Sequence, residues 1–157
     1  MISIRRFAEN DHDEVVALIQ GIMAQEFAQD AHAYPTADLD TISDTYGSLG
    51  EAFFVAVDGK KIIGTVGIKK EDTRIALLRR LFVSADYRGQ KLGSKLIQRA
   101  LQFCEEVGYD EFVFRTTSRM TQAIELCKKN GFIQRAKIQL GPIELFKFVL
   151  ALHPLNK

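Results

Sequence analysis

The chain is poor in the residues that bind structural metals or form disulfide frameworks. It contains two cysteines, Cys104 and Cys127, and three histidines, His12, His32 and His153, none of which is near a cysteine in the sequence. Both cysteines lie in segments with a helical pattern, and their separation matches no zinc motif. We therefore expect reduced thiols in a reducing compartment and no metal site.

Long hydrophobic runs are also missing. No run approaches the ~20 apolar residues that cross a bilayer, and the N-terminal sequence MISIRRFAEN has no apolar segment after its charges, unlike a secretory signal peptide. These absences predict a cytoplasmic protein that does not enter a membrane. Of the 157 residues, 46% are hydrophobic and 26% charged, which is typical of a globular protein, and we expect one domain over residues 1–157.

Positive charge is absent from a long early stretch. No lysine or arginine occurs between Arg6 and Lys60, although the net charge of the whole chain is +1, and residues 7–59 hold eleven carboxylates. A region of one sign attracts ligands of the opposite sign, so we expect a cationic ligand here. An ordinary solvated acidic face is the alternative interpretation.

Hydrophobic periodicity predicts alternating strands and helices. Apolar residues alternate with polar ones at Ile2 and Ile4, and from Val15 to Met23 they recur at helical spacing. Asp58-Gly59 between two apolar runs is a strong hairpin signal. After the first strand and the first helix, the pattern predicts a short helix at 37–46 and strands at 53–57, 61–68 and 75–83. It then predicts a helix at 92–107, a strand at 111–116, a helix at 120–129, and strands at 133–139 and 143–150.

Residues 76–101, ALLRRLFVSADYRGQKLGSKLIQRAL, change from strand to helical periodicity within YRGQKLGS. Gly89 and Gly93 lack a Cβ, so backbone N–H groups can approach a ligand there, and the first turn of the following helix has unpaired N–H donors. Six cations against one aspartate give residues 79–99 a net charge of +5. We expect this corner to bind phosphate. A common strand-turn-helix corner without a ligand is the alternative.

The sequence YRGQKLGSKLI at residues 87–97 resembles the acyl-CoA pyrophosphate loop of the GNAT superfamily of N-acetyltransferases, Gln/Arg-x-x-Gly-x-Gly/Ala. Arg88 and Gly93 match its first and last positions, and Lys91 replaces its middle glycine. If the backbone there has a positive φ, lysine would cost roughly 1 kcal/mol while adding a cation beside the phosphates.

A second segment, AIELCKKNGF at residues 123–132, resembles the A-x-x-L-Y-x-K-x-G-F segment of the same superfamily. Cys127 stands in place of the tyrosine proposed to protonate the departing thiolate. Cys127 is either a surrogate acid or a small apolar filler, which is the more common role of a helical cysteine. We expect it to be dispensable for turnover, because the leaving thiolate needs little help from an acid.

The resemblance implies an α/β fold with a central mixed, mostly antiparallel sheet of about seven strands, flanked by about four helices. It implies acetyl-CoA as co-substrate and a primary amine of a small molecule or protein as acceptor. It also implies that the two strands ending near Val83 and Thr116 splay apart and admit the pantetheine arm between them. A backbone N–H near Val83 would bind the thioester oxygen. We expect Gly93→Glu to abolish acetyl-CoA binding and to leave the fold intact. The residues that the resemblance assigns to the cofactor are Leu81, Phe82, Val83, Arg88, Gly89, Gln90, Lys91, Leu92, Gly93 and Ser94.

Other site roles stay open at this level. Arg79 and Arg80 are adjacent on a predicted strand, so we expect their side chains to point to opposite faces. Lys128 and Lys129 either reach the 3′-phosphate of CoA or interact with the helix dipole, and Phe82 is expected in the core. The candidate bases on the acceptor side are Glu26, Asp30, Asp38, Asp40, Asp44 and Glu51.

Three function classes compete. The first is an N-acetyltransferase, with a cationic amine as the expected acceptor; the second is a non-catalytic module that binds acyl-CoA. The third, a nucleic-acid-binding domain, is disfavoured because the basic cluster has no interleaved aromatic residues. The sequence leaves open whether the chain acts alone or as a homodimer.

Overall fold

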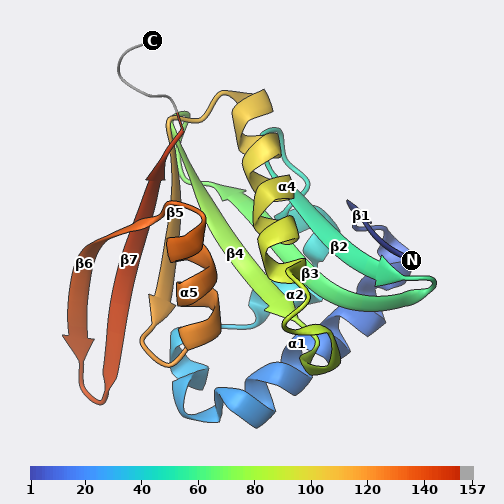
Figure 1. Cartoon of the computed structure of the whole chain (residues 1–157), viewed down its shortest axis with the longest axis horizontal. Coiled ribbons are helices and arrows are strands. Elements are labelled where there is room, and N and C mark those ends of the chain that lie inside the picture. Colours follow the sequence, from blue (N-terminus) through green and yellow to red (C-terminus); the bar gives the residue numbers. More distant parts are fainter. Residues whose placement is uncertain (153–157) are drawn as a thin grey trace.

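The computed structural model describes residues 1–152 as a seven-stranded mixed sheet with helices on both faces (Figure 1). The strand order is β1-β2-β3-β4-β5-β7-β6, and all neighbouring pairs are antiparallel except β4 and β5. This confirms the predicted fold class. His153 lies outside the described residues. The elements are β1 (Ile2–Arg6), η1 (Glu9–Asp11), α1 (His12–Glu26), η2 (Ala28–Ala33), α2 (Ala37–Asp40), α3 (Ile42–Thr45), β2 (Ala52–Asp58), β3 (Lys61–Lys70), β4 (Ile75–Val83), η3 (Ala85–Tyr87), α4 (Leu92–Val107), β5 (Glu111–Thr117), α5 (Thr121–Lys129), β6 (Ile133–Leu140) and β7 (Ile143–Ala151).

The β2–β3 hairpin forms where the sequence predicts one, with its turn one residue further along. Asp58 is the last paired residue of β2 and lies opposite Lys61, so the two turn residues are Gly59 and Lys60. Gly59 has a φ of 63°, a left-handed conformation that glycine adopts without steric cost.

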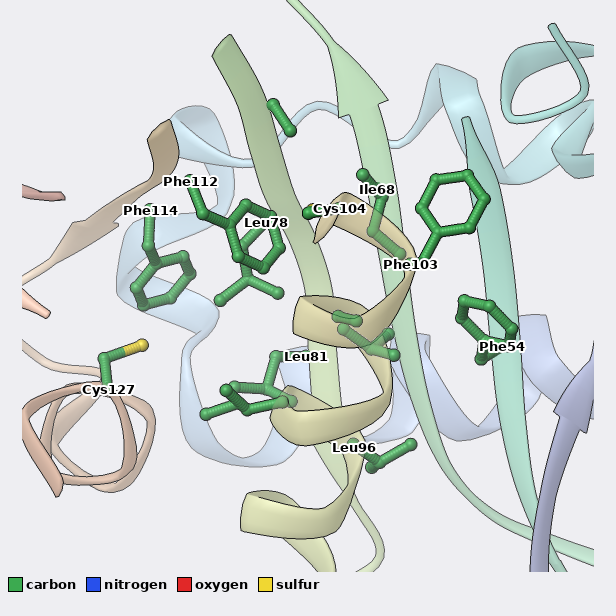
Figure 2. Packing of buried hydrophobic residues seen from close by; sticks show 14 of the residues in the cluster. Phe54, Ile68, Leu78, Leu81, Leu96, Phe103, Cys104, Phe112, Phe114 and Cys127 are labelled. Carbon is green, nitrogen blue, oxygen red and sulfur yellow. The ribbon is translucent and has the colours of Figure 1, made fainter. Parts of the chain in front are cut away.

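Apolar side chains pack against both faces of the sheet. On one face Leu96 of α4 is buried in the same cluster as Phe54 of β2 (Figure 2). On the other face α1 buries Val15, Ile19 and Ile22, which confirms the apolar stripe predicted for the first helix. None of the helices in residues 1–152 is long and apolar enough to cross a membrane.

The parallel strands β4 and β5 pair only at their starts, through residues 75–77 of β4 and 111–113 of β5. Beyond this point the two strands diverge (Figure 1), and β4 continues to Val83 paired with β3 alone on its other edge. The structure therefore confirms the predicted separation of these strands. Within the described chain, the β5-facing edge of β4 has no strand partner after Leu77.

A β-bulge in β4 redirects the side chain of Arg80. The β3–β4 register shifts between Thr65 and Gly67, and Arg80 has a φ of 52°. The Arg80 guanidinium reaches Asp38 on α2, and Arg79 and Arg80 both line one cavity, described below. The prediction that these arginines point to opposite faces is wrong, because strict alternation stops at a bulge.

Candidate active site

The predicted phosphate corner connects β4 to α4. After η3, the chain reaches α4 through two residues with positive φ, Gly89 at 82° and Lys91 at 65°. Lys91 is also the N-cap of α4, and its side chain makes no capping hydrogen bond. The N–H groups in the first turn of α4 are therefore not capped by this side chain and can bind an anion.

Lys91 has a left-handed conformation, which explains why the resembled loop has a glycine at this position. Its φ of 65° and ψ of 13° cost an L-residue about 1 kcal/mol or more. The strain considered from the sequence is thus present. The Lys91 side chain is exposed, so its ammonium group adds a cation beside the corner.

A cavity of about 510 Å³, which we call the corner cavity, lies between this loop and α5. Gln90 is exposed and does not line it, and of the two late lysines of α5 only Lys129 does. Lys129 and Leu126 belong to the second motif found in the sequence, whereas Thr121 and Gln122 precede that motif and were not identified from the sequence. The predicted cofactor residues that line the cavity are Val83, Arg88, Gly89, Lys91, Leu92, Gly93 and Ser94, and α5 adds Gln122, Glu125 and Leu126, with Thr121 at its start.

Gly93 packs against α5 as well as forming part of the corner. A Cβ at Gly93 would lie 2.4 Å from a methyl carbon of Leu126 on α5, far closer than two carbon atoms can approach. This methyl group is the end of a flexible, partly exposed side chain, so Gly93→Glu requires Leu126 to move, and the expectation that the variant keeps the fold stays a prediction.

The corner cavity continues along β4. A middle cavity of about 50 Å³ shares Val83, Arg88, Gln122 and Leu126 with it. A third cavity of about 240 Å³, the wedge cavity, lies between the diverging strands β4 and β5. It shares Leu81, Phe82 and Met120 with the middle cavity, so the three cavities lie in a row along the unpaired edge of β4, and we call this row the channel.

The wedge cavity has an unexpectedly basic lining. Arg79, Arg80 and Arg115 line it, and no carboxylate does. Tyr34 also lines this end of the channel, and its hydroxyl accepts a 2.7 Å hydrogen bond from the N–H of Thr117. No local sequence signal marks Tyr34, because its partner is 83 residues away.

Most of the six candidate bases are engaged elsewhere or lie outside the channel. Asp38 binds the guanidinium of Arg80, and buried Asp30 accepts a 2.6 Å hydrogen bond from the hydroxyl of Thr117. Glu51 pairs with Lys69 at 2.9 Å, and neither Asp40 nor Asp44 lines any of the three cavities. Glu26, the last residue of α1, lines the middle cavity and is the one candidate that lines the channel in the described chain.

Comparison with known proteins agrees with this geometry. Residues 8–132 match the family model of the acetyltransferase (GNAT) family. The chain belongs to this family. The match extends from the residues after β1 to the end of the second motif, and so includes the corner and α5.

Two relatives show how much of the chain the sequence similarity covers. N-acetyltransferase 8B of Homo sapiens is 33% identical over 101 residues, which cover 60% of this chain and 44% of that protein. The N-acetyltransferase YjgM of Escherichia coli is 25% identical over 134 residues, 82% of this chain and 80% of that protein. The chain thus spans less than half of the length of N-acetyltransferase 8B.

Solved structures show the same fold. A GNAT-family acetyltransferase of Staphylococcus aureus Mu50 has a TM-score of 0.87 at 23% identity, with 98% of this chain and 100% of that chain covered. The yncA protein of Salmonella typhimurium, solved with its cofactor acetyl-CoA, has a TM-score of 0.82 at 18% identity, with 97% and 94% covered.

In this GNAT chain, Cys127 belongs to the core. It is fully buried and points from α5 into the packed side chains that include Phe114 and Leu81 (Figure 2). Burial raises the pKa of the Cys127 thiol to about 12, and Cys127 lines none of the three cavities. The thiol therefore has no path to a thiolate leaving from the channel.

We expect Cys127→Ala to keep kcat within about tenfold of the parent value, equivalent to less than 1.4 kcal/mol in the barrier. Steady-state assays of thiol release at saturating acetyl-CoA measure this. The variant should instead be less stable, because it loses a buried sulfur atom from the core. A thousandfold lower kcat with CoA binding preserved would contradict the core role.

Proposed function

We propose that this acetyltransferase transfers the acetyl group of acetyl-CoA to a primary amine of a small molecule or protein. The observation that supports this most is the row of three neighbouring cavities, which runs from a corner suited to phosphate to a wedge between two strands. When bound, acetyl-CoA would supply an acetyl group already activated as a thioester. The residues present fit it: Arg88, Lys91 and Lys129 provide cations, and the first turn of α4 provides N–H donors.

The chain's own residues divide the work along the channel. The corner binds and orients the pyrophosphate, and the unpaired edge of β4 at Leu81–Val83 offers backbone groups to the amides of the pantetheine arm. Apolar side chains of Phe82 and Met120 line the passage to the wedge and reduce access of water. A donor from the β4 backbone near Val83, as the resemblance implies, would stabilise charge on the thioester oxygen.

The free energies of proton transfer indicate whether a general base or a general acid contributes more to the reaction. An alkylammonium of pKa 10.4 loses a proton at pH 7 at a cost of about 4 to 5 kcal/mol, whereas a thiolate whose thiol has a pKa near 8.5 leaves at a cost of about 2 kcal/mol. A base is therefore more valuable than an acid, which agrees with the burial of Cys127.

The charge of the wedge cavity bears on the acceptor. Arg80 is paired with Asp38, and Arg115 lies 3.2 Å from Glu71. No carboxylate of the described residues forms an ion pair with Arg79, which also lines the cavity. We infer that the acceptor carries a carboxylate near its amine, and that Arg79 binds it. The cationic acceptor expected from the sequence is the competing hypothesis.

We expect a free amino acid to be acetylated with a kcat/KM at least tenfold above that of its amide. Arg79→Gln should raise KM for the acid about tenfold and leave KM for the amide unchanged, since hydrogen bonds to charged groups contribute about 1.5–3 kcal/mol. Arg135→Gln, which removes an exposed arginine from β6, is the control. A preference for polyamines, together with a kcat/KM that falls as salt rises, would favour the cationic acceptor.

Isothermal titration with acetyl-CoA, followed by thiol-release assays against these amines, tests the proposed function as a whole. Binding without release of thiol for any amine would favour the non-catalytic module instead. The cytoplasmic location and the homodimer stay predictions.

A further inference from the structure

Arg88 lies across the channel between the corner and the middle cavity. Its Nε donates a 3.1 Å hydrogen bond to the carbonyl of Val83 at the end of β4. Its two terminal nitrogens donate to the two carboxylate oxygens of Glu26 at 3.0 and 2.9 Å. One guanidinium thus connects the end of α1 to the end of β4.

The same guanidinium lines the corner cavity together with Gly93 and Ser94. The parallel N–H donors of arginine bind a carboxylate and a phosphate in the same bidentate geometry. Glu26 and a pyrophosphate in the corner would therefore compete for one set of donors, and the pyrophosphate carries the larger negative charge.

The position of Glu26 is unfavourable for its own helix. A carboxylate at the C-terminal end of α1 faces the negative end of the helix dipole, and the last turn of α1 contains no basic residue. The charge of Arg88, 62 residues away, compensates for this in the ligand-free chain. Both side chains are partly exposed, 25% for Arg88 and 32% for Glu26, so the pair can separate without opening the core.

We propose that Arg88 exchanges Glu26 for the pyrophosphate of acetyl-CoA, and that the released Glu26 is the catalytic base. The exchange involves the two terminal nitrogens that hold Glu26, and it leaves the Glu26 carboxylate unpaired in the middle cavity, which Leu81 and Phe82 also line. The base would thus become available only after acetyl-CoA is bound. This inference rests on the proposed function.

The proton and bond changes balance as follows. The ammonium group of the acceptor gives one proton to the Glu26 carboxylate, and the neutral nitrogen forms a bond to the acetyl carbon. The C–S bond breaks, and its electron pair leaves with the sulfur of CoA. The nitrogen then loses a second proton; of the two protons released, one goes to the thiolate and the other to solvent from Glu26.

The test is Glu26→Gln, with Asp13→Asn as the control. Asp13 is a fully exposed carboxylate at the other end of α1, so the control makes the same charge change on the same helix. Titration with CoA alone should show about tenfold tighter binding by Glu26→Gln, because an amide competes less well than a carboxylate for Arg88. Asp13→Asn should bind CoA like the parent.

Turnover should change in the opposite direction. At saturating acetyl-CoA, kcat of Glu26→Gln for an alkylamine should fall about a hundredfold. The deficit should shrink for an amine that is already neutral at pH 7, such as an aromatic amine, and with rising pH for the alkylamine.

Separate outcomes test the separate parts of this inference. Unchanged or weaker CoA binding by Glu26→Gln would overturn the exchange. An unchanged kcat, or a loss equal for neutral and protonated amines, would overturn the role of Glu26 as base. A parent chain that binds no CoA would contradict the proposed function itself.

Discussion

Replacing Ser94 with glutamate should weaken the binding of acetyl-CoA by about a thousandfold while leaving the protein folded. Ser94 lies in the first turn of α4 and lines the corner cavity. Two like charges about 4 Å apart near a protein surface repel by about 4 kcal/mol, and each 1.4 kcal/mol changes Kd about tenfold. The carboxylate would stand where the pyrophosphate is proposed to bind.

The same substitution should not destabilise the fold. The first turn of α4 contains no acidic residue, and a carboxylate there interacts favourably with the helix dipole, typically by 0.3–1 kcal/mol. We therefore expect the melting temperature of Ser94→Glu to equal or slightly exceed that of the parent. Ser94→Glu is a cleaner test than Gly93→Glu, whose Cβ requires the Leu126 side chain to move.

Isothermal titration with CoA measures the loss of affinity, and thermal unfolding measures the stability. Gln102→Glu is the matched control, since Gln102 is exposed on the same helix two turns further along and the charge change is the same. If Ser94→Glu binds CoA as tightly as Gln102→Glu does, the phosphate site is not at this corner.

Local backbone requirements explain what the sequence could predict. Gly59 marks the β2–β3 hairpin and Gly89 the corner because both have a positive φ, with values of 63° and 82°. The order of strands and helices follows from periodicity, which is also local. The replacement of a glycine by Lys91 predicted a strained turn, and the structure contains one at this residue.

The features that the sequence could not predict depend on contacts between residues far apart in the chain. Glu26, Asp30 and Asp38 pair with arginines that are 62, 89 and 42 residues further along the chain. Three of the eleven carboxylates in residues 7–59 are therefore paired with positive charge from the second half of the fold. No periodicity reveals such pairs.

The bulge at Arg80 was equally hidden, because a change of register depends on the partner strand. The hydroxyl of Thr65 on β3 donates a 2.7 Å hydrogen bond to the carbonyl of Arg80. This bond satisfies a backbone group that the shifted register leaves unpaired. The bulge also brings the Arg80 side chain to Asp38, and these two residues form the most strongly buried ion pair of the site.

Asp38→Asn should lower the free energy of unfolding by about 3–5 kcal/mol, because removal of one partner from a buried ion pair leaves the other charge uncompensated. The side chains of Arg80 and Asp38 are only 6% and 8% exposed, and their closest atoms are 2.5 Å apart. The same carboxylate also accepts a 2.8 Å hydrogen bond from the hydroxyl of Tyr46. For a chain of this length, we expect the melting temperature to fall by about 10 °C.

Glu71→Gln is the control, since it removes one partner of the exposed Arg115–Glu71 pair. The side chains of that pair are 52% and 37% exposed, so the change should cost at most about 1 kcal/mol. Denaturant unfolding of both variants measures the difference. Equal losses for the two variants would show that the Asp38–Arg80 pair contributes no more than a surface pair.

The pH dependence of stability gives an independent readout. Burial alone would raise the pKa of Asp38, but the hydrogen bonds and the charge of Arg80 outweigh it and hold this pKa below its ordinary value of 3.8. The ionised carboxylate therefore stabilises the fold above about pH 4, and this contribution is lost as pH falls through the lowered pKa. The amide of Asp38→Asn does not titrate in this range. The difference in free energy of unfolding between parent and variant should therefore be largest at neutral pH and diminish in acid. A difference that stays constant from pH 7 to pH 2 would contradict a charged Asp38 as the source of the stability.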